Sequence, residues 1–183
     1  MTNFRELRRE TVYSGRAFAV ERVTFILPDD RERTYDLVDH RGSVTVIPLD
    51  AGGRILFVTQ YRLGAGAALL ELPAGVNDGE DPAECAAREI REETGMAAGK
   101  LQLLGSFYLA PGYSNEYMHI FLATDLHPEP LAADDDEFLT VSAIPAAEAL
   151  AMARRGEIHD GKTLAALFLA ETHLLPGSQS TQN

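Results

Sequence analysis

The sequence has little of several features that mark particular classes of protein. It contains one cysteine, Cys85, so no disulfide can form within the chain, as is typical of proteins in a reducing compartment. No apolar run approaches the ~20 residues needed to cross a bilayer. The basic N-terminus is followed by no apolar stretch, which argues against a secretory signal. We therefore expect a cytoplasmic protein that does not contact membranes.

Basic residues are also scarce. The 16 Lys and Arg residues are outnumbered by 28 Asp and Glu residues, which gives a formal net charge of −12. A surface of this sign repels nucleic acid and anionic membranes, so we expect neither as a partner. Metal ions can still allow an acidic protein to bind an anionic small molecule. With 183 residues, 45% of them hydrophobic, the chain can form one good-sized core and a small appendage.

The first part of the chain is predicted to form a small β unit. Residues 17–27 are rich in Val, Phe and Ile, and residues 33–38 resemble a returning strand. Between them, Pro28-Asp29-Asp30 is a turn signal. A unit of this size is too small for a core of its own. We therefore expect residues 1–42 to pack on the rest of the chain or on a second copy of it.

The remainder has the pattern of a mixed α/β domain. The clearest helix has Asp81 as its N-cap, Pro82 as its first residue and Gly95 just beyond its end. The last residues, 176–183, are small and polar and are expected to be disordered. Strands are predicted over residues 44–49, 55–61, 69–72, 101–109, 117–123 and 138–144, and helices over residues 82–94, 145–155 and 163–175.

The first of these helices carries several carboxylates near its C-terminal end. Glu89 and Glu93 are four residues apart and share one face, and Glu92 lies beside them. Like charges at this spacing destabilise a helix by about 0.2–0.5 kcal/mol per pair, and the helix dipole disfavours anions in the last turn. A divalent cation that prefers oxygen ligands would offset both costs. The alternative interpretation is a solvated acidic face.

The surroundings of these carboxylates resemble the Nudix box, whose pattern is G-x5-E-x7-R-E-U-x-E-E-x-G-U, where U is a bulky aliphatic residue. Every specified position from Glu80 to Met96 matches, and the one departure is that four residues, not five, separate Gly75 from Glu80. Other segments resemble the ADP-ribose pyrophosphatase branch of the Nudix hydrolases: QYR at 60–62, ELPAG at 71–75, APGY at 110–113, NE at 115–116 and DGKT at 160–163.

This resemblance implies a fold and an activity. The implied fold is α/β of the α+β type, in which a mixed β-sheet is sandwiched by helices. Residues 43–175 form the Nudix hydrolase domain. An N-terminal antiparallel β unit over residues 1–42 is expected to pair two chains into a homodimer. The activity is metal-dependent hydrolysis of the diphosphate bond in ADP-ribose or a related nucleoside diphosphate sugar. The products are a nucleoside monophosphate and a sugar phosphate. The alternatives are a GDP-mannose pyrophosphatase and a non-catalytic Nudix-fold ligand sensor.

The resemblance also implies a metal site. Glu89, Glu93 and the Ala74 carbonyl are the expected ligands of Mg²⁺ or Mn²⁺, and Glu92 is either a further ligand or a partner of the ligands. Arg88 is expected to orient the carboxylates by ion pairing, although a plain surface salt bridge is the alternative. We expect Glu93 to lie at a largely exposed position, where a polar substitution costs little stability.

Two further residues are candidates for contacting the substrate. Arg62 follows a predicted strand, and its guanidinium suits bidentate recognition of phosphate or ribose oxygens. Glu116 is a candidate polar contact in the same cleft. For both, an ordinary surface role is an equal alternative. Cys85, which lies among alanines on the helix, is expected to be a small buried hydrophobe.

The acidic run that ends at Glu137 is the candidate source of the base that activates water, as in the resembled branch. Glu137 is the first choice and Asp135 the second, and a solvated loop is the alternative. We predict that Glu137→Gln lowers kcat by ~10²–10⁴-fold, the usual range for a general base, and leaves KM little changed. Asp135→Asn is to be measured in parallel. Unchanged kcat in both variants would remove this loop from the mechanism.

Overall fold

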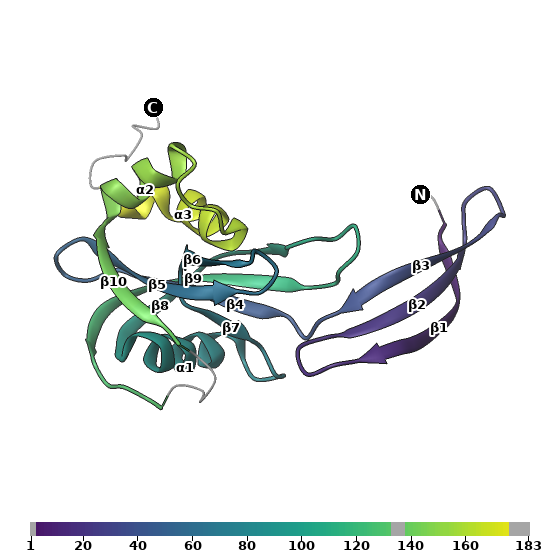
Figure 1. The fold of residues 1–183 in the computed structure, drawn as a ribbon, viewed down its shortest axis with the longest axis horizontal. Helices are drawn as coiled ribbons and strands as arrows, with labels where there is room; N and C mark the ends of the chain where they lie inside the picture. The colour runs from purple at the N-terminus through teal and green to yellow at the C-terminus, as the bar shows by residue number, and fades with distance from the viewer. Residues whose placement is uncertain (1–2, 133–137, 176–183) are drawn as a thin grey trace. The chain divides into compact units, whose positions relative to one another are not determined.

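The chain divides into two units (Figure 1). The structure, a computed structural model, describes residues 3–132 and 138–175. Residues up to Gly42, together with Phe107–Met118, form the first unit. Ser43–Ser106 and the chain from His119 onward form the second. Within the described ranges, no helix is both long enough and apolar enough to cross a membrane.

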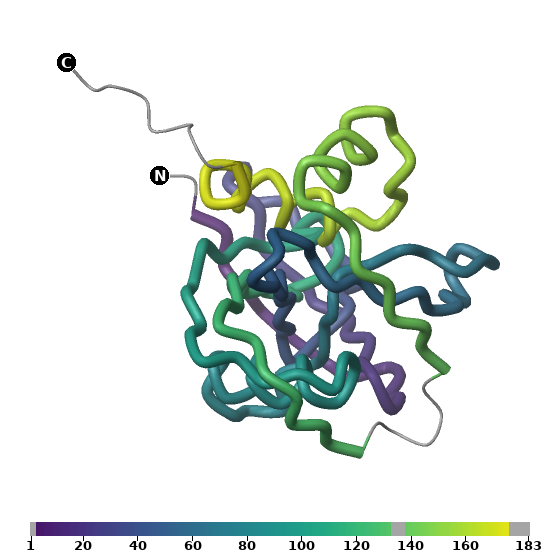
Figure 2. The backbone as a smooth tube through the Cα atoms, turned by 90° about the vertical axis from the view of Figure 1, so that its left-hand side faces the viewer, coloured from purple at the N-terminus to yellow at the C-terminus, as the bar shows by residue number. Residues whose placement is uncertain are grey.

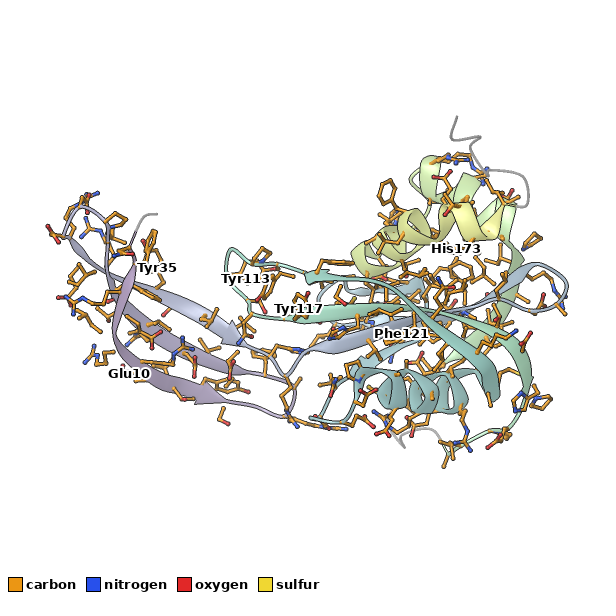
Figure 3. The ribbon with its side chains drawn as sticks, turned by 180° about the vertical axis from the view of Figure 1, so that it is seen from behind. Glu10, Tyr35, Tyr113, Tyr117, Phe121 and His173 are labelled. Atoms are coloured by element: carbon orange, nitrogen blue, oxygen red, sulfur yellow. The ribbon has the colours of Figure 1, made fainter. Side chains whose placement is uncertain are left out.

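The first unit is built on a three-stranded antiparallel sheet in the order β1-β2-β3. The predicted turn at Pro28-Asp29-Asp30 joins β2 to β3, and Asp30 adopts a positive φ of 63° there. Figure 3 shows Glu10 on β1 and Tyr35 on β3. The strands are β1 (Arg5–Ser14), β2 (Ala19–Ile26) and β3 (Glu32–Asp39).

Strand β1 was not predicted from the sequence. Its residues, RELRRETVYS, include several charges, and all of them are exposed. It is held by its backbone pairing with β2 and by cross-strand ion pairs, among them Arg9 with Glu21 and Arg22 with Glu10. Opposite charges that face each other across a sheet stabilise the pairing. Because so many of its residues are charged, β1 shows little of the apolar–polar alternation that marks a half-buried strand.

The second unit contains two sheets and three helices in the described part of the chain. The sheets have the strand orders β10-β5-β6 and β7-β4-β9-β8, and the ends of β8 and β9 beyond Ser106 and before His119 belong to the first unit. The elements are β4 (Ser43–Pro48), β5 (Arg54–Arg62), β6 (Ala67–Glu71), β7 (Ala74–Val76), α1 (Pro82–Thr94), β8 (Met96–Tyr108), β9 (Tyr117–Pro128), β10 (Thr140–Pro145), α2 (Ala146–Arg154) and α3 (Gly161–Leu174).

Strand β4 lies at the centre of this unit. All of its residues are buried, as expected for a strand covered on both faces. It contacts α1 and α3, and α1 lies on the opposite side of the strands from α2 and α3 (Figure 1). Helices α2 and α3 contact each other and lie side by side in Figures 1 and 2. The predicted α+β class, a mixed sheet between helices, is confirmed.

The core beneath α1 explains how that helix is oriented. Phe121 enters this core from β9 (Figure 3), and Cys85 is fully buried in it, as predicted. Burial raises the pKa of the Cys85 thiol to about 12, so the thiol is neutral at physiological pH. The buried members of the cluster are Val44, Val46, Cys85, Ala86, Ile90, Phe121 and Ala123.

Candidate active site

Helix α1 has the boundaries that the sequence predicts, and these boundaries determine which residues face inward. The Asp81 side chain accepts a hydrogen bond of 2.8 Å from the Ala83 N–H. At the other end, Gly95 has φ 73° and donates its N–H to the Arg91 carbonyl over 3.1 Å. The buried face between these caps consists of Cys85, Ala86, Glu89, Ile90 and Glu93.

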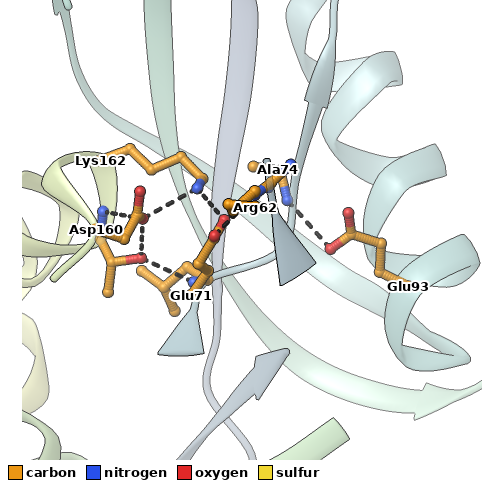
Figure 4. A network of polar contacts seen from close by, with 8 residues as sticks. Arg62, Glu71, Ala74, Glu93, Asp160 and Lys162 are labelled. Atoms are coloured by element: carbon orange, nitrogen blue, oxygen red, sulfur yellow. Dashed lines mark hydrogen bonds and ion pairs between the residues drawn. The ribbon is translucent and has the colours of Figure 1, made fainter. Parts of the chain in front are cut away.

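The two carboxylates of that face are removed from solvent. Glu89 is 7% exposed and Glu93 is 5% exposed. The expectation that Glu93 is largely exposed was therefore wrong, because α1 turns this side toward β7. There Glu93 Oε2 accepts a hydrogen bond of 3.3 Å from the Ala74 N–H (Figure 4). Two buried carboxylates one helical turn apart disfavour each other's charged form unless a cation or several donors compensate.

Gly75 lies directly against Glu89. A Cβ atom at position 75 would come within 1.9 Å of Glu89 Oε1, so a side chain there would displace the carboxylate. The shortened loop after Gly75 keeps this arrangement. It is closed by a hydrogen bond of 2.9 Å from the Gly79 N–H to Asn77 Oδ1, and Gly79 adopts φ 92°. The missing residue of the Nudix pattern therefore does not separate Gly75 from the helix.

Arg88 joins three carboxylates. Its guanidinium is 2.7 Å from Glu80 Oε1, from Glu89 Oε1 and from Glu92 Oε2. Burial opposes the charge of Arg88, but the ion pairs outweigh it and raise the pKa of the guanidinium. Of the two partners that lie on α1, the Glu92 side chain is 22% exposed and the Glu89 side chain is 9% exposed. The role of Glu92 as a direct ligand stays a prediction.

The carboxylate oxygens gathered at α1 are the type of ligand that a hard divalent cation prefers. Among the described residues, no group of three or more His, Cys, Asp or Glu side chains is arranged to hold a metal ion. Glu89 and Glu93 nevertheless place two carboxylates against the backbone of Ala74–Gly75. Mg²⁺ is often held by one or two carboxylates and keeps waters and substrate phosphates as its other ligands. The residues present are therefore sufficient for such a site.

A second charged group lies at the ends of β5 and β6. Arg62 donates two hydrogen bonds to Glu71, from Nε over 2.8 Å and from Nη2 over 2.6 Å (Figure 4). Burial opposes ionisation of Glu71, but the hydrogen bonds from Arg62 and Lys162 outweigh it and lower the pKa of Glu71. The Arg62 side chain is 40% exposed, so this bidentate pair leaves other guanidinium N–H groups for a ligand.

Sequence reasoning did not identify Glu71 and Lys162 as functional residues. They were noted only within the segments ELPAG and DGKT. The residues are 91 positions apart, and no local pattern indicates that their side chains form an ion pair. The signal that could have singled them out is the presence of a charged residue in an otherwise apolar strand, since LLELP places Glu71 where a core residue is expected.

The described structure does not test the other predicted site residues. Glu116 belongs to the first unit, where its N–H donates to Ser114 Oγ over 3.1 Å, and its contact with substrate stays a prediction. Asp135 and Glu137 lie outside the described residues. Just before them, the Leu131 N–H donates to the Arg91 carbonyl over 3.3 Å, near the C-terminal end of α1.

Comparison with known proteins identifies relatives along most of the chain. The sequence model of the NUDIX domain family matches residues 39–167. An ADP-ribose pyrophosphatase of Mycobacterium tuberculosis is 37% identical over 91% of this chain and 82% of its own length. A GDP-mannose pyrophosphatase of Yersinia enterocolitica is 32% identical over 90% of this chain and 94% of its own. A solved structure of an ADP compounds hydrolase, 30% identical, matches with a TM-score of 0.83 over 93% and 94% of the two chains.

The close approach of Gly75 to Glu89 generates a prediction. Gly75→Ala should weaken binding of Mn²⁺ by ~10–100-fold, the range for disturbing the surroundings of metal ligands, because the new Cβ forces the Glu89 carboxylate aside. Titration of the substrate-free protein with Mn²⁺, followed by electron paramagnetic resonance, measures this. Gly64→Ala is the matched control, since no atom lies within 4 Å of a Cβ built there. Equal Mn²⁺ affinity in all three proteins would contradict the assignment.

Proposed function

The chain belongs to the NUDIX domain family and is a Nudix hydrolase, and we propose that it hydrolyses nucleoside diphosphate sugars with Mg²⁺ or Mn²⁺, with ADP-ribose as its preferred substrate. The observation that carries this proposal is the pair of buried carboxylates, Glu89 and Glu93, held against Ala74–Gly75. Divalent cations held by these carboxylates would let the acidic site bind an anionic diphosphate.

The proposed reaction adds water across the P–O–P bond. The water oxygen forms a new bond to one phosphorus, and the bridging oxygen leaves with the other phosphoryl group. One molecule of ADP-ribose and one of water thus give AMP and ribose 5-phosphate. Such displacements need positioning and charge neutralisation more than covalent help from the protein. The fixed charges around α1 suit this requirement.

Residues of α1 and β7 would hold the cation. Glu89 and Glu93, with the Ala74 carbonyl, are the proposed ligands, and Arg88 keeps Glu89 in place through its 2.7 Å ion pair. When bound, the cation supplies charge neutralisation at the diphosphate and lowers the pKa of a coordinated water. Removal of the water's proton falls to a general base, for which Glu137 and then Asp135 are proposed.

Arg62 is the proposed diphosphate ligand supplied by the protein itself. Its contacts with Glu71 fix the plane of the guanidinium, and a guanidinium held in this way can bind phosphate oxygens bidentately at little entropic cost. Glu116 is proposed as a polar contact to the nucleoside or sugar. Both residues would act by binding and orientation rather than by proton transfer.

The preference for ADP-ribose over GDP-mannose rests on similarity. The segments around Arg62, Glu71 and Lys162 resemble the ADP-ribose branch, and the Mycobacterium tuberculosis relative has 37% identity against 32% for the Yersinia enterocolitica relative. A GDP-mannose pyrophosphatase is therefore the second candidate. A ligand sensor without catalysis would be favoured by loss of a metal carboxylate, and all three candidate carboxylates, Glu89, Glu92 and Glu93, are present.

A hydrolysis panel tests the function. ADP-ribose, ADP-glucose, GDP-mannose, NADH and diadenosine polyphosphates are incubated with the protein and Mg²⁺ or Mn²⁺, and products are separated by chromatography. We expect ADP-ribose to have the highest kcat/KM and to give AMP.

Exhaustive EDTA treatment should abolish turnover, and Glu93→Gln should lose most of it, because a neutral amide is a poor ligand for a hard cation. Full turnover in EDTA, or no turnover of any substrate, would refute the proposal.

We also propose that the protein is a homodimer that pairs through the first unit. The first unit leaves large apolar side chains exposed on a single chain: Phe4, Leu7, Val12, Tyr13, Phe18 and Tyr35 are each more than 40% exposed. Six large apolar side chains exposed on so small a unit suit an interface with a second chain. A sheet of this size also lacks the area for a core of its own.

Light scattering tests the dimer. At micromolar concentration, the wild-type mass should be twice the 20.0 kDa of one chain. Val12→Glu should shift the mass toward that of one chain, because it places a charge among the exposed apolar side chains of the first unit. Leu103→Glu is the matched control in the second unit, since Leu103 is 52% exposed and Val12 is 45% exposed. A wild-type mass of one chain would contradict the proposal.

A further inference from the structure

A closed ring of polar contacts joins the start of α3 to the end of β6 (Figure 4). Lys162 forms ion pairs with Glu71 and, over 3.0 Å, with Asp160 Oδ2. The same Asp160 oxygen accepts hydrogen bonds from the Thr163 N–H over 3.0 Å and from its hydroxyl over 2.6 Å. The Thr163 hydroxyl in turn accepts the Leu72 N–H over 2.9 Å. Because Leu72 follows Glu71, these five residues close a ring.

The ring is deeply buried. Glu71, Leu72 and Thr163 have no exposed surface, and the Lys162 side chain is only 10% exposed. A charge or hydrogen-bonding group buried without a partner is costly, so each member of the ring constrains its neighbours. The Thr163 hydroxyl donates one hydrogen bond and accepts another, which a hydroxyl can do and a methyl group cannot. The ring therefore holds its part of β6 in one position.

The segment that follows the ring leads directly to the proposed metal site. The Pro73 carbonyl accepts the Val46 N–H over 2.8 Å. The next residue, Ala74, donates its N–H to Glu93 Oε2 over 3.3 Å. Every residue from Glu71 to Ala74 thus has a side-chain or backbone anchor. A displacement of the Leu72 backbone would therefore be passed on to the Ala74 backbone.

We propose that Lys162, Asp160 and Thr163 are positioning residues for the metal site. They act through the segment from Glu71 to Ala74, and they set where the Ala74 backbone meets Glu93 and where Arg62 presents its guanidinium. This inference rests on the proposed metal site at Glu89 and Glu93 and extends it to the start of α3. None of the three residues is proposed to touch the cation.

A purely structural role is the competing explanation, because Asp160 is also the N-cap of α3. Loss of a helix cap lowers the stability of the fold, but it does not by itself move a residue at the far end of the ring. The two roles therefore predict different metal affinities for folded variants of these residues. Stability alone does not distinguish them.

The test compares Thr163→Val with Thr163→Ser in the full chain. Valine has nearly the shape of threonine but leaves the Leu72 N–H without its acceptor, whereas serine keeps the hydroxyl. Mn²⁺ binding, followed by electron paramagnetic resonance without substrate, should weaken by ~10–100-fold in Thr163→Val, the range for residues that support metal ligands. Thr163→Ser should restore the affinity to within about threefold of wild type. The Mg²⁺ concentration for half-maximal hydrolysis should rise in parallel.

Leu167→Val controls for general destabilisation, since Leu167 is a buried residue of α3 that takes no part in the ring. It should lower the melting temperature and leave Mn²⁺ affinity unchanged. If Thr163→Val does not fold, Lys162→Gln carries the same expectation for Mn²⁺. Wild-type Mn²⁺ affinity in a folded Thr163→Val or Lys162→Gln would overturn the inference. Absence of nucleotide hydrolysis by the wild type would instead refute the proposed function, and the Mn²⁺ comparison would still stand.

Discussion

Burial of two like charges on one face of α1 is the constraint on which the second unit depends. Glu89 and Glu93 continue the apolar stripe that includes Cys85, so the packing that forms the core also removes both carboxylates from water. Buried carboxylates are costly unless donors or cations face them. The Ala74 N–H and Arg88 supply part of this compensation. A divalent cation is the natural source of the rest, and the diphosphate substrate is a natural ligand for that cation.

The same constraint acts at Glu71, where Arg62 and Lys162 provide the compensating charge. In the described part of the chain, every buried side-chain nitrogen or oxygen has a hydrogen-bond partner. A substitution at one member of a buried network leaves another group without its partner, so it can displace the backbone that the network holds in place. Residues that never touch the substrate can therefore affect the site.

The success of the sequence-based predictions depended on how local the signal was. Helix α1 was predicted to the residue because Asp81, Pro82 and Gly95 act on their immediate neighbours. Strand β1 was missed because its charged sequence lacks the alternation of apolar and polar residues, and its backbone partners and opposite charges are supplied by β2. The exposure of Glu93 was predicted wrongly because a carboxylate at helical spacing has the pattern of a solvated face until the partner of that face is known.

The residue pattern alone determined the family, the register of α1 and the identity of its acids, because helix periodicity and capping operate over a few residues. The tertiary structure decided what each acid meets. Gly75 lies against Glu89 because β7 runs beside α1, and Lys162 reaches Glu71 across 91 positions of sequence. Contacts between residues so far apart depend on strand order and on which face of each element is buried. No window of the sequence contains that information, so only the folded chain specifies these partners.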